Sequence, residues 1–298
     1  MTIRIPAATT IVAGLILLAL AQAAMAQPAA TKPATAPRPA TAPATSRPAT
    51  QAVSQPASQP VDPAVEAILD DTERAGKEFH TIQGDVEFVE VQTLFDEKKT
   101  FLGQIYFDKP APDKDARFRI HFDSIKDRAK VKADRDVSFF ADREGRWLIT
   151  RDGDIKQWRK YQVARPGETF DPLKLGKGPF PVPFGQDKAE VLRLFTVTTR
   201  GATAEDPKDT RYLQLIPGAE AARDLTVRKV EIWVGSDGLP VRVRTEDPEG
   251  AVTKTATFSK VAKNAKLPDH VFELPKPGAD WDVQVELLKR PGEAGNNP

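Results

Sequence analysis

The chain has 298 residues, 40% of them hydrophobic and 29% charged, which is ordinary for a soluble globular protein. Its 43 basic and 42 acidic residues nearly cancel, which argues against a nucleic-acid partner, because phosphate binding needs a strong positive excess. There is no cysteine, so the fold has no disulfide and no cysteine that could carry a lipid anchor.

The first 26 residues predict a secretory signal peptide. Arg4 supplies a positive charge, an apolar run begins at Ile11, and Ala24-Met25-Ala26 has the A-x-A form of a cleavage site. The apolar run falls short of the ~20 residues that span a bilayer. We therefore expect cleavage after Ala26 and a periplasmic protein. The alternative, an uncleaved signal, would tether the chain to the inner membrane.

Composition divides the rest of the chain into three parts. Residues 27–61 consist almost wholly of Ala, Pro, Thr, Ser and Gln, which cannot form a core, so we expect a disordered, polyproline-like spacer there. A single domain is predicted over 62–288. A disordered tail is expected at 289–298.

The domain is predicted to begin with an amphipathic helix over about 62–79. Asp62 is a good N-cap, and Pro63 suits the first helical position, where the backbone nitrogen needs no hydrogen to donate. Apolar residues recur at helical spacing from Val65 to Phe79. One face of this helix must therefore pack against the rest of the domain.

After the helix, the apolar pattern changes to a period of two, which predicts β-strands. In ARFRIHFD (116–123), Phe118, Ile120 and Phe122 alternate with polar side chains, and turn sequences such as Ser236-Asp237-Gly238 separate the runs. Nine runs have clear limits: 81–91, 100–108, 116–123, 147–150, 155–163, 211–216, 227–234, 240–245 and 251–261. We expect about ten or eleven antiparallel strands in one large sheet with one apolar face.

A proline-rich stretch interrupts this pattern. GPFPVPFGQ (178–186) has three prolines, which exclude a helix or a central strand, yet its Phe and Val side chains do not suit a solvated loop. QDKAEVLRLF (186–195) follows, and Asp187 and Glu190 have the spacing of a capping box for a short helix. We expect both helices to pack on the apolar face of the sheet.

No catalytic or metal-binding group is evident in the sequence. His80, His121 and His270 lack metal-ligand spacing, and His121 is expected to be exposed on the polar face of its strand. We therefore expect no enzyme activity, no cofactor and no metal. Two interpretations of the apolar face stay open: a densely packed core, or a cavity that two short helices fill only in part.

Most of residues 64–286 resembles the outer-membrane lipoprotein carrier protein family (LolA-like). The resemblance rests on GQIYFDKP (103–110), on RFRIHF, and on GLPVRVRTEDPEG followed by TFSKVAKNAKLPDHVFELPKPGADWDV, in the family's order. It implies a mainly β (α+β) fold, an incomplete antiparallel β-barrel of about 10–11 strands whose helices cover a hydrophobic cavity, with a closing strand at the end. The family's usual Arg before Pro is Lys109 here, and charged insertions at 124–136 and 201–210 lengthen the chain.

The resemblance also implies a function and partners. Carriers of this family shield the acyl chains of lipoproteins between an inner-membrane release complex and an outer-membrane receptor. The implied lipid-binding residues are Val86, Phe88, Ile105, Phe118, Ile120 and Phe122 in the cavity floor, and Phe180, Phe184, Val191, Leu192 and Phe195 in a lid, with Lys109 at the rim. The same fold occurs in regulators that sense lipid or polymer during envelope stress, and this alternative stays open.

Overall fold

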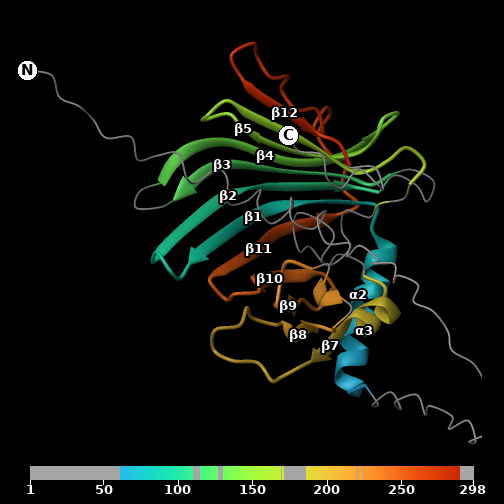
Figure 1. Cartoon of the computed structure of the whole chain (residues 1–298). Helices are drawn as coiled ribbons and strands as arrows, with labels where there is room; N and C mark the ends of the chain where they lie inside the picture. Colours follow the sequence, from blue (N-terminus) through green and yellow to red (C-terminus); the bar gives the residue numbers. More distant parts are fainter. Residues whose placement is uncertain are drawn as a thin grey trace, which may run out of the picture.

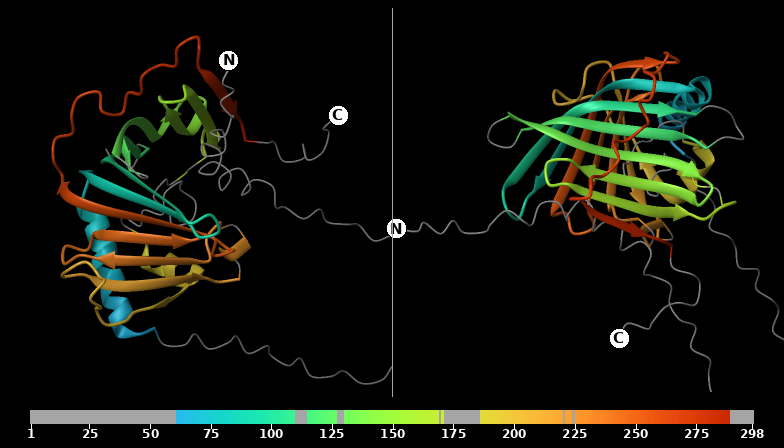
Figure 2. Two further views of the ribbon diagram at one scale, coloured as in Figure 1. Left: turned by 90° about the vertical axis from the view of Figure 1, so that its left-hand side faces the viewer. Right: turned by 90° about the horizontal axis from the view of Figure 1, so that it is seen from above.

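A computed structural model describes residues 61–109, 115–126, 130–168, 170, 186–219, 221–223 and 225–288. They form a 12-stranded sheet in the order β12-β6-β5-β4-β3-β2-β1-β11-β10-β9-β8-β7. The sheet is curved, and its two edge strands, β12 and β7, do not pair with each other, so it does not close into a barrel (Figures 1 and 2). The predicted mainly β class is confirmed, with twelve strands rather than ten or eleven. The expected signal peptide, most of the spacer and the tail lie outside the described residues.

The elements have the following bounds. The helices are α2 (Pro63–Glu78), α3 (Lys188–Leu194) and the short 3-10 helix η2 (Ala221–Arg223). Six strands precede α3: β1 (Thr81–Gln92), β2 (Glu97–Asp108), β3 (Arg117–Lys126), β4 (Lys130–Asp142), β5 (Gly145–Asp152) and β6 (Gln157–Ala164). Six follow it: β7 (Phe195–Thr198), β8 (Arg211–Pro217), β9 (Lys229–Val234), β10 (Pro240–Glu246), β11 (Val252–Lys263) and β12 (Asp282–Glu286).

Both helices begin where their capping residues predict. The Asp62 carboxylate accepts a hydrogen bond from the Ala64 backbone N–H at 2.8 Å, and the Asp187 carboxylate accepts one from the Glu190 N–H at 2.9 Å. The apolar stripe of α2, which begins at Val65, is buried. The second helix ends one residue earlier than expected, because Phe195 already pairs with β8 as the first residue of β7.

Strand β4 corrects the interpretation of 124–136 as a charged insertion. It pairs along its length with β3 and β5, and Val137 and Phe139 are buried on one of its faces. On the opposite face Asp136 and Ser138 are buried too. Charged residues on both faces of β4 hide its period of two: Asp136 is buried on this face, whereas Arg135 lies on the face of Val137 and Lys132 is exposed.

Strand β12 corrects the expectation of a wholly antiparallel sheet, because it pairs with β6 in parallel. Residues 264–281 connect β11 to β12 across the outside of the sheet (Figure 2). We call this segment the outer strap. Its Val271 carbonyl accepts a hydrogen bond from Arg119 at 2.9 Å, and the Arg151 guanidinium lies 5.2 Å from the Trp281 ring.

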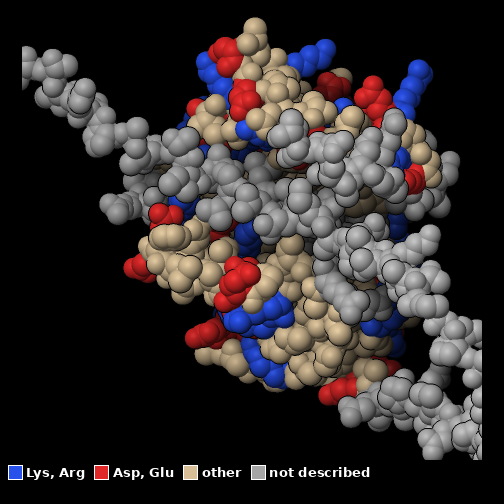
Figure 3. Space-filling model, in the orientation of Figure 1, with Lys and Arg blue, Asp and Glu red and all other residues tan. Residues whose placement is uncertain are grey.

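Helix α2 covers only part of the sheet. It lies alongside β1 and β7–β11, whereas β3–β6 and β12 extend beyond its C-terminal end (Figures 1 and 2). At that end Phe79 contacts Phe107 of β2 edge to face, with ring centroids 5.7 Å apart. No helix among the described residues is long and apolar enough to span a membrane. Basic and acidic side chains are interspersed on the surface seen in Figure 3, in keeping with the near-zero net charge.

Candidate functional site, the inner face of the sheet

The inner face of the sheet, the face on which α2 and α3 pack, is built from alternate residues of each strand. The register between strands aligns these residues in rows that cross the sheet. One row runs from β1 to β6 and carries Ile82, Phe107, Phe118, Phe139, Leu148 and Tyr161. All of these except Tyr161 are buried. The inner face is therefore continuous across strands that α2 does not reach.

Three phenylalanine rings form a cluster on this face, one from each of β1, β2 and β3. The ring centroids are 6.0 Å apart between Phe88 and Phe101, 6.2 Å between Phe88 and Phe122, and 5.6 Å between Phe101 and Phe122. Each ring is buried. Tilted aromatic pairs at this spacing contribute about 0.5–1.5 kcal/mol beyond the area they bury. We call these three residues the phenylalanine cluster.

The structure places all six predicted floor residues on the inner face. Val86, Phe88, Ile105, Phe118, Ile120 and Phe122 are each buried within one hydrophobic core. Alternation along β1, β2 and β3 is what brings them together. Their role in lipid binding stays a prediction, because burial alone describes an ordinary core equally well.

The predicted lid residues divide into two groups. Phe180 and Phe184 lie outside the described residues, as does the rest of the proline stretch up to residue 185. On α3, Val191 is buried and Leu192 half-buried, and Phe195 is buried at the start of β7. Lys109, the expected rim residue, directly follows β2 and is exposed, and its backbone N–H donates to the His80 carbonyl at 2.7 Å.

A slot lies between the helices and the sheet. Leu69 of α2 and Val191 of α3 line it on one side, and Leu213 and Ile232 line it on the other. Its volume is about 10 Å³, which is roughly the space of one water molecule. At this place the densely packed interpretation holds, and an acyl chain would need the helices to move.

Towards β6 and β12 the inner face becomes polar. One row runs Phe122, Arg135, Asp152, Gln157 and Asp282, and the next runs Ile120, Val137, Thr150, Arg159 and Gln284. Arg135 Nε lies 3.0 Å from the Asp152 carboxylate, and Arg159 donates to Asp282 at 2.8 Å. Burial raises the pKa of Asp152. Burial, with the nearby Glu286 charge, raises the pKa of Tyr161 to about 12.

Sequence reasoning missed this polar end of the inner face. The predicted strand at 147–150 stops short of Asp152, and Arg135 lies in a stretch that the sequence predicts to be an insertion. A signal was present, because Arg135, Val137 and Phe139 share the period of two. The position of Arg135 beside Phe122 depends on the pairing of β3 with β4, which sequence periodicity does not specify.

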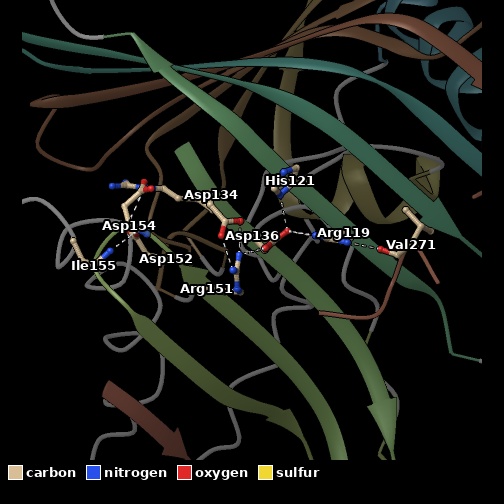
Figure 4. Close-up of polar contacts among 10 residues, drawn as sticks. Arg119, His121, Asp134, Asp136, Arg151, Asp152, Asp154, Ile155 and Val271 are labelled. Atoms are coloured by element: carbon tan, nitrogen blue, oxygen red, sulfur yellow. Dashed lines mark hydrogen bonds and ion pairs between the residues drawn. The ribbon is translucent and has the colours of Figure 1, made fainter. Parts of the chain in front are cut away.

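On the outer face, His121 belongs to a charged network rather than standing exposed as expected (Figure 4). Its Nδ1 lies 3.0 Å from one oxygen of Asp136, whose side chain is 0% exposed. Arg119 donates to the same oxygen at 2.8 Å, and Arg151 donates to the other at 2.9 Å. Burial opposes ionisation of Asp136, but the His121 hydrogen bond and the Arg119 charge prevail, so the pKa of Asp136 is lowered.

The same network has the residue types of a metal site but the charge balance of an ion-pair cluster. Ligand atoms of His121, Asp134 and Asp136 lie within 4.8 Å of one another. However, Arg151 donates to both oxygens of Asp134 at 2.6 Å, and both oxygens of Asp136 are also engaged. Two guanidinium groups thus stand where a cation would neutralise the carboxylates, and the network holds β3, β4, β5 and the outer strap together.

Neither a protein-family model nor a curated protein matches the chain. Among solved structures, a LolA superfamily protein from Nitrosomonas europaea is 13% identical, with 70% of this chain and 96% of that chain covered and a TM-score of 0.32. LprF from Mycobacterium bovis is 14% identical, with 70% and 97% covered and a TM-score of 0.38. MucB from Pseudomonas aeruginosa, solved in complex with MucA, is 16% identical, with 70% and 60% covered and a TM-score of 0.37. These neighbours include the superfamily that the sequence resembles, and the likeness concerns the fold alone.

Proposed function

We propose that this protein is a periplasmic carrier that shields the acyl chains of lipoproteins on its inner face during transfer towards the outer membrane. The observation that carries the proposal is the extent of the apolar inner face. The phenylalanine cluster and the pair Phe118 and Phe139 lie on strands β1–β4, whereas α2 and α3 pack at the β7–β11 end. The helices alone are too short to account for so large an apolar surface.

The free energy of moving an acyl chain through water sets how much apolar contact such a carrier must supply. Exposing an acyl chain of 16 carbons to water costs roughly 10 kcal/mol, at ~0.8 kcal/mol for each CH₂ group. One buried phenylalanine side chain contributes about 1.5–3 kcal/mol by the same scale. Five inner-face rings from β1–β4 are buried in this structure, so they offer contact of the required order to a chain that displaces the groups covering them; they are Phe88, Phe101, Phe118, Phe122 and Phe139.

Release requires that something compete with the lipid. We propose that α3 and the preceding proline stretch act as a lid, in which Phe180, Phe184, Val191, Leu192 and Phe195 cover the inner face when no lipid is bound. In this proposal, the slot of about 10 Å³ beneath α3 corresponds to the closed lid. Because the lid buries its own apolar side chains there, a bound chain must displace them, which lowers its affinity enough for release.

The partners follow from this activity. An inner-membrane release complex would load the carrier with an acylated lipoprotein, and an outer-membrane receptor would accept the cargo. Whether the carrier is free in the periplasm or tethered to the inner membrane depends on cleavage after Ala26. Recovery of a regulator protein in place of acylated proteins, when the protein is purified from the envelope, would favour the stress-sensing alternative.

A reactivity experiment tests the proposal with a matched pair of sites on β1. The chain has no cysteine, so Val86→Cys on the inner face and Val89→Cys on the outer face each introduce one nearly isosteric thiol. The reagent is hexadecyl methanethiosulfonate, followed by intact mass. Val86 is 3% exposed and Val89 is half-buried, so exposure alone makes the thiol at position 89 react faster.

The carrier proposal expects the opposite order. The thiol at position 86 should react faster with the long-chain reagent, and a palmitoylated peptide should protect it. With a short, polar methanethiosulfonate the thiol at position 89 should react faster, which controls for intrinsic access. If the long-chain reagent also follows simple exposure, the inner face is a closed core and the proposal fails.

A further inference from the structure

The polar end of the inner face contains a mostly buried arginine, which an ordinary hydrophobic core does not need. Arg159 lies on β6 in the same row as Thr150 and Val137, with the apolar Ile120 next along. Its side chain is only 12% exposed, so the charge is held close to the apolar floor rather than in water. A buried charge is costly unless every donor finds an acceptor.

One donor of Arg159 lacks such an acceptor. Its Nη2 donates to Asp282 of β12 at 2.8 Å, but its Nη1 is buried and has no hydrogen-bond partner among the described residues. Roughly nine in ten buried polar groups are hydrogen-bonded in folded proteins. An unpaired guanidinium N–H beside an apolar floor therefore suits an acceptor oxygen brought by a ligand.

Arg135, on β4 in the adjacent row, lies between the phenylalanine cluster and this end of the inner face. Its guanidinium carbon lies 5.8 Å from the centre of the Phe101 ring, and Phe122 is its neighbour in the row. Its own charge is already balanced by Asp152 at 3.0 Å and Asp154 at 3.5 Å. An acyl chain that lies over the phenylalanine cluster on β3 would thus reach the polar end at β5, two strands further along the sheet.

The net charge of this end of the inner face indicates whether the polar group of an acyl ligand bound there would be charged or neutral. Arg135 and Arg159 are opposed by four carboxylates on the same side of the sheet, those of Asp152, Asp154, Asp282 and Glu286. The excess is negative, so a further anion, such as the carboxylate of a free fatty acid, is disfavoured. An uncharged carbonyl oxygen can accept from Arg159 without adding charge.

We infer that the end of the inner face formed by β5, β6 and β12 is a subsite for the uncharged ester or amide carbonyl of an acyl ligand, with Arg159 Nη1 as the donor. This inference rests on the proposed function, because it concerns the same inner face. It adds a selectivity: the protein prefers acyl esters and amides to free fatty acids of equal chain length.

The test compares three ligands in the full-length protein. Diphenylhexatriene, which has no acceptor, reports binding to the apolar face, and a neutral palmitoylated tetrapeptide and palmitate compete for it. Wild type should bind the palmitoylated peptide at least several-fold more tightly than palmitate. Arg159→Met should weaken the peptide about tenfold, the loss of one hydrogen bond to a charged donor, and leave diphenylhexatriene unaffected. Asp282, left without its partner, is 54% exposed and stays solvated.

Lys160→Met is the matched control, because Lys160 is the next residue of β6 and lies on the outer face over the Trp147 ring. It should change none of the three affinities. Tighter binding of palmitate than of the peptide by wild type would overturn the inference without any variant, and so would an unchanged peptide affinity in a folded Arg159→Met protein. If wild type binds none of the three ligands, the proposed function itself has failed.

Discussion

Asp136 of β4 and Arg151 of β5 form a buried ion pair on the outer face, with 2.9 Å between Oδ2 and Nη1 and side-chain exposures of 0% and 6%. Without the Asp136 charge, Arg119 loses its carboxylate partner and Arg151 keeps only the more exposed Asp134, and breaking a buried pair typically costs about 3–5 kcal/mol. We therefore expect Asp136→Asn to lower the free energy of unfolding by about that amount in urea denaturation. Asp134→Asn is the control: Asp134 also binds Arg151, but its side chain is 47% exposed, and its loss should cost less than ~1 kcal/mol. Equal losses in the free energy of unfolding for the two variants would show that the burial of Asp136 does not increase its contribution to stability.

The pH dependence of stability should carry the signature of the same carboxylate. The pKa of Asp136 is lowered in the folded protein, whereas its unfolded pKa is about 3.9. The contribution of the ionised form is therefore fully present above about pH 4 and is lost as the pH falls through the folded value. Urea denaturation of wild type from pH 7 to pH 3 should show this loss. Asp136→Asn should flatten the acid limb, and a parallel curve for the variant would contradict the assignment.

These two predictions concern residues whose importance the sequence did not reveal. Alternation in RFRIHF correctly placed Phe118, Ile120 and Phe122 on one face, because a strand's period of two is a local property. The partners of His121 lie on β4, at a register that only long-range pairing sets. Local spacing could not show that a histidine on a polar face would meet a buried aspartate.

The same distinction explains where the predicted strands and their pairing differ from the structure. The sequence predicts an insertion at 124–136 because the charged residues of β4 hide its period of two. The buried Asp136 pairs with Arg119, which also donates to the Val271 carbonyl of the outer strap, more than 120 positions later in the chain. Strand β12 is the closing strand that the resemblance implies, and its apolar residues, Val283 and Val285, are both exposed. Its parallel pairing with β6 depends on the route of the strap rather than on its own sequence.

Gly103 permits a close approach of β2 to β3. A Cβ atom at this position would lie 1.9 Å from the backbone carbonyl oxygen of His121, at the irregularity where the register between the two strands shifts. Backbone cannot give way as a flexible side chain does, so we expect Gly103→Ala to destabilise the protein by about 3 kcal/mol, the upper part of the range for overpacking. Gly201→Ala, with no atom within 4 Å of the added carbon, should stay within ~0.5 kcal/mol of wild type. Thermal and urea unfolding of both variants would decide.

The lid proposal predicts opposite effects of one substitution on stability and on binding. Val191 of α3 is buried in the slot against Leu69 and Leu213. Val191→Ala should lower the free energy of unfolding by about 1–2 kcal/mol, because it removes buried methyl groups. It should also tighten the binding of a palmitoylated peptide several-fold, since a weaker lid competes less. If affinity falls together with stability, Val191 is a core residue and not part of a displaceable lid.

Strand β12 should be the least stable strand of the β1–β6 half of the sheet. Each of its five residues is exposed, and it pairs only with β6, whereas β1 pairs with both β2 and β11. Local opening exposes amides according to the contacts that must break, so hydrogen exchange in β12 should be at least a hundredfold faster than in β1. Trp281→Ala removes the ring that packs near Arg151 and should speed exchange in β12 and β6 without affecting β1. Protection of β12 equal to that of β1 would mean that the C-terminal strand is part of the cooperative core, and that the polar end of the inner face is as rigid as the apolar floor beside it.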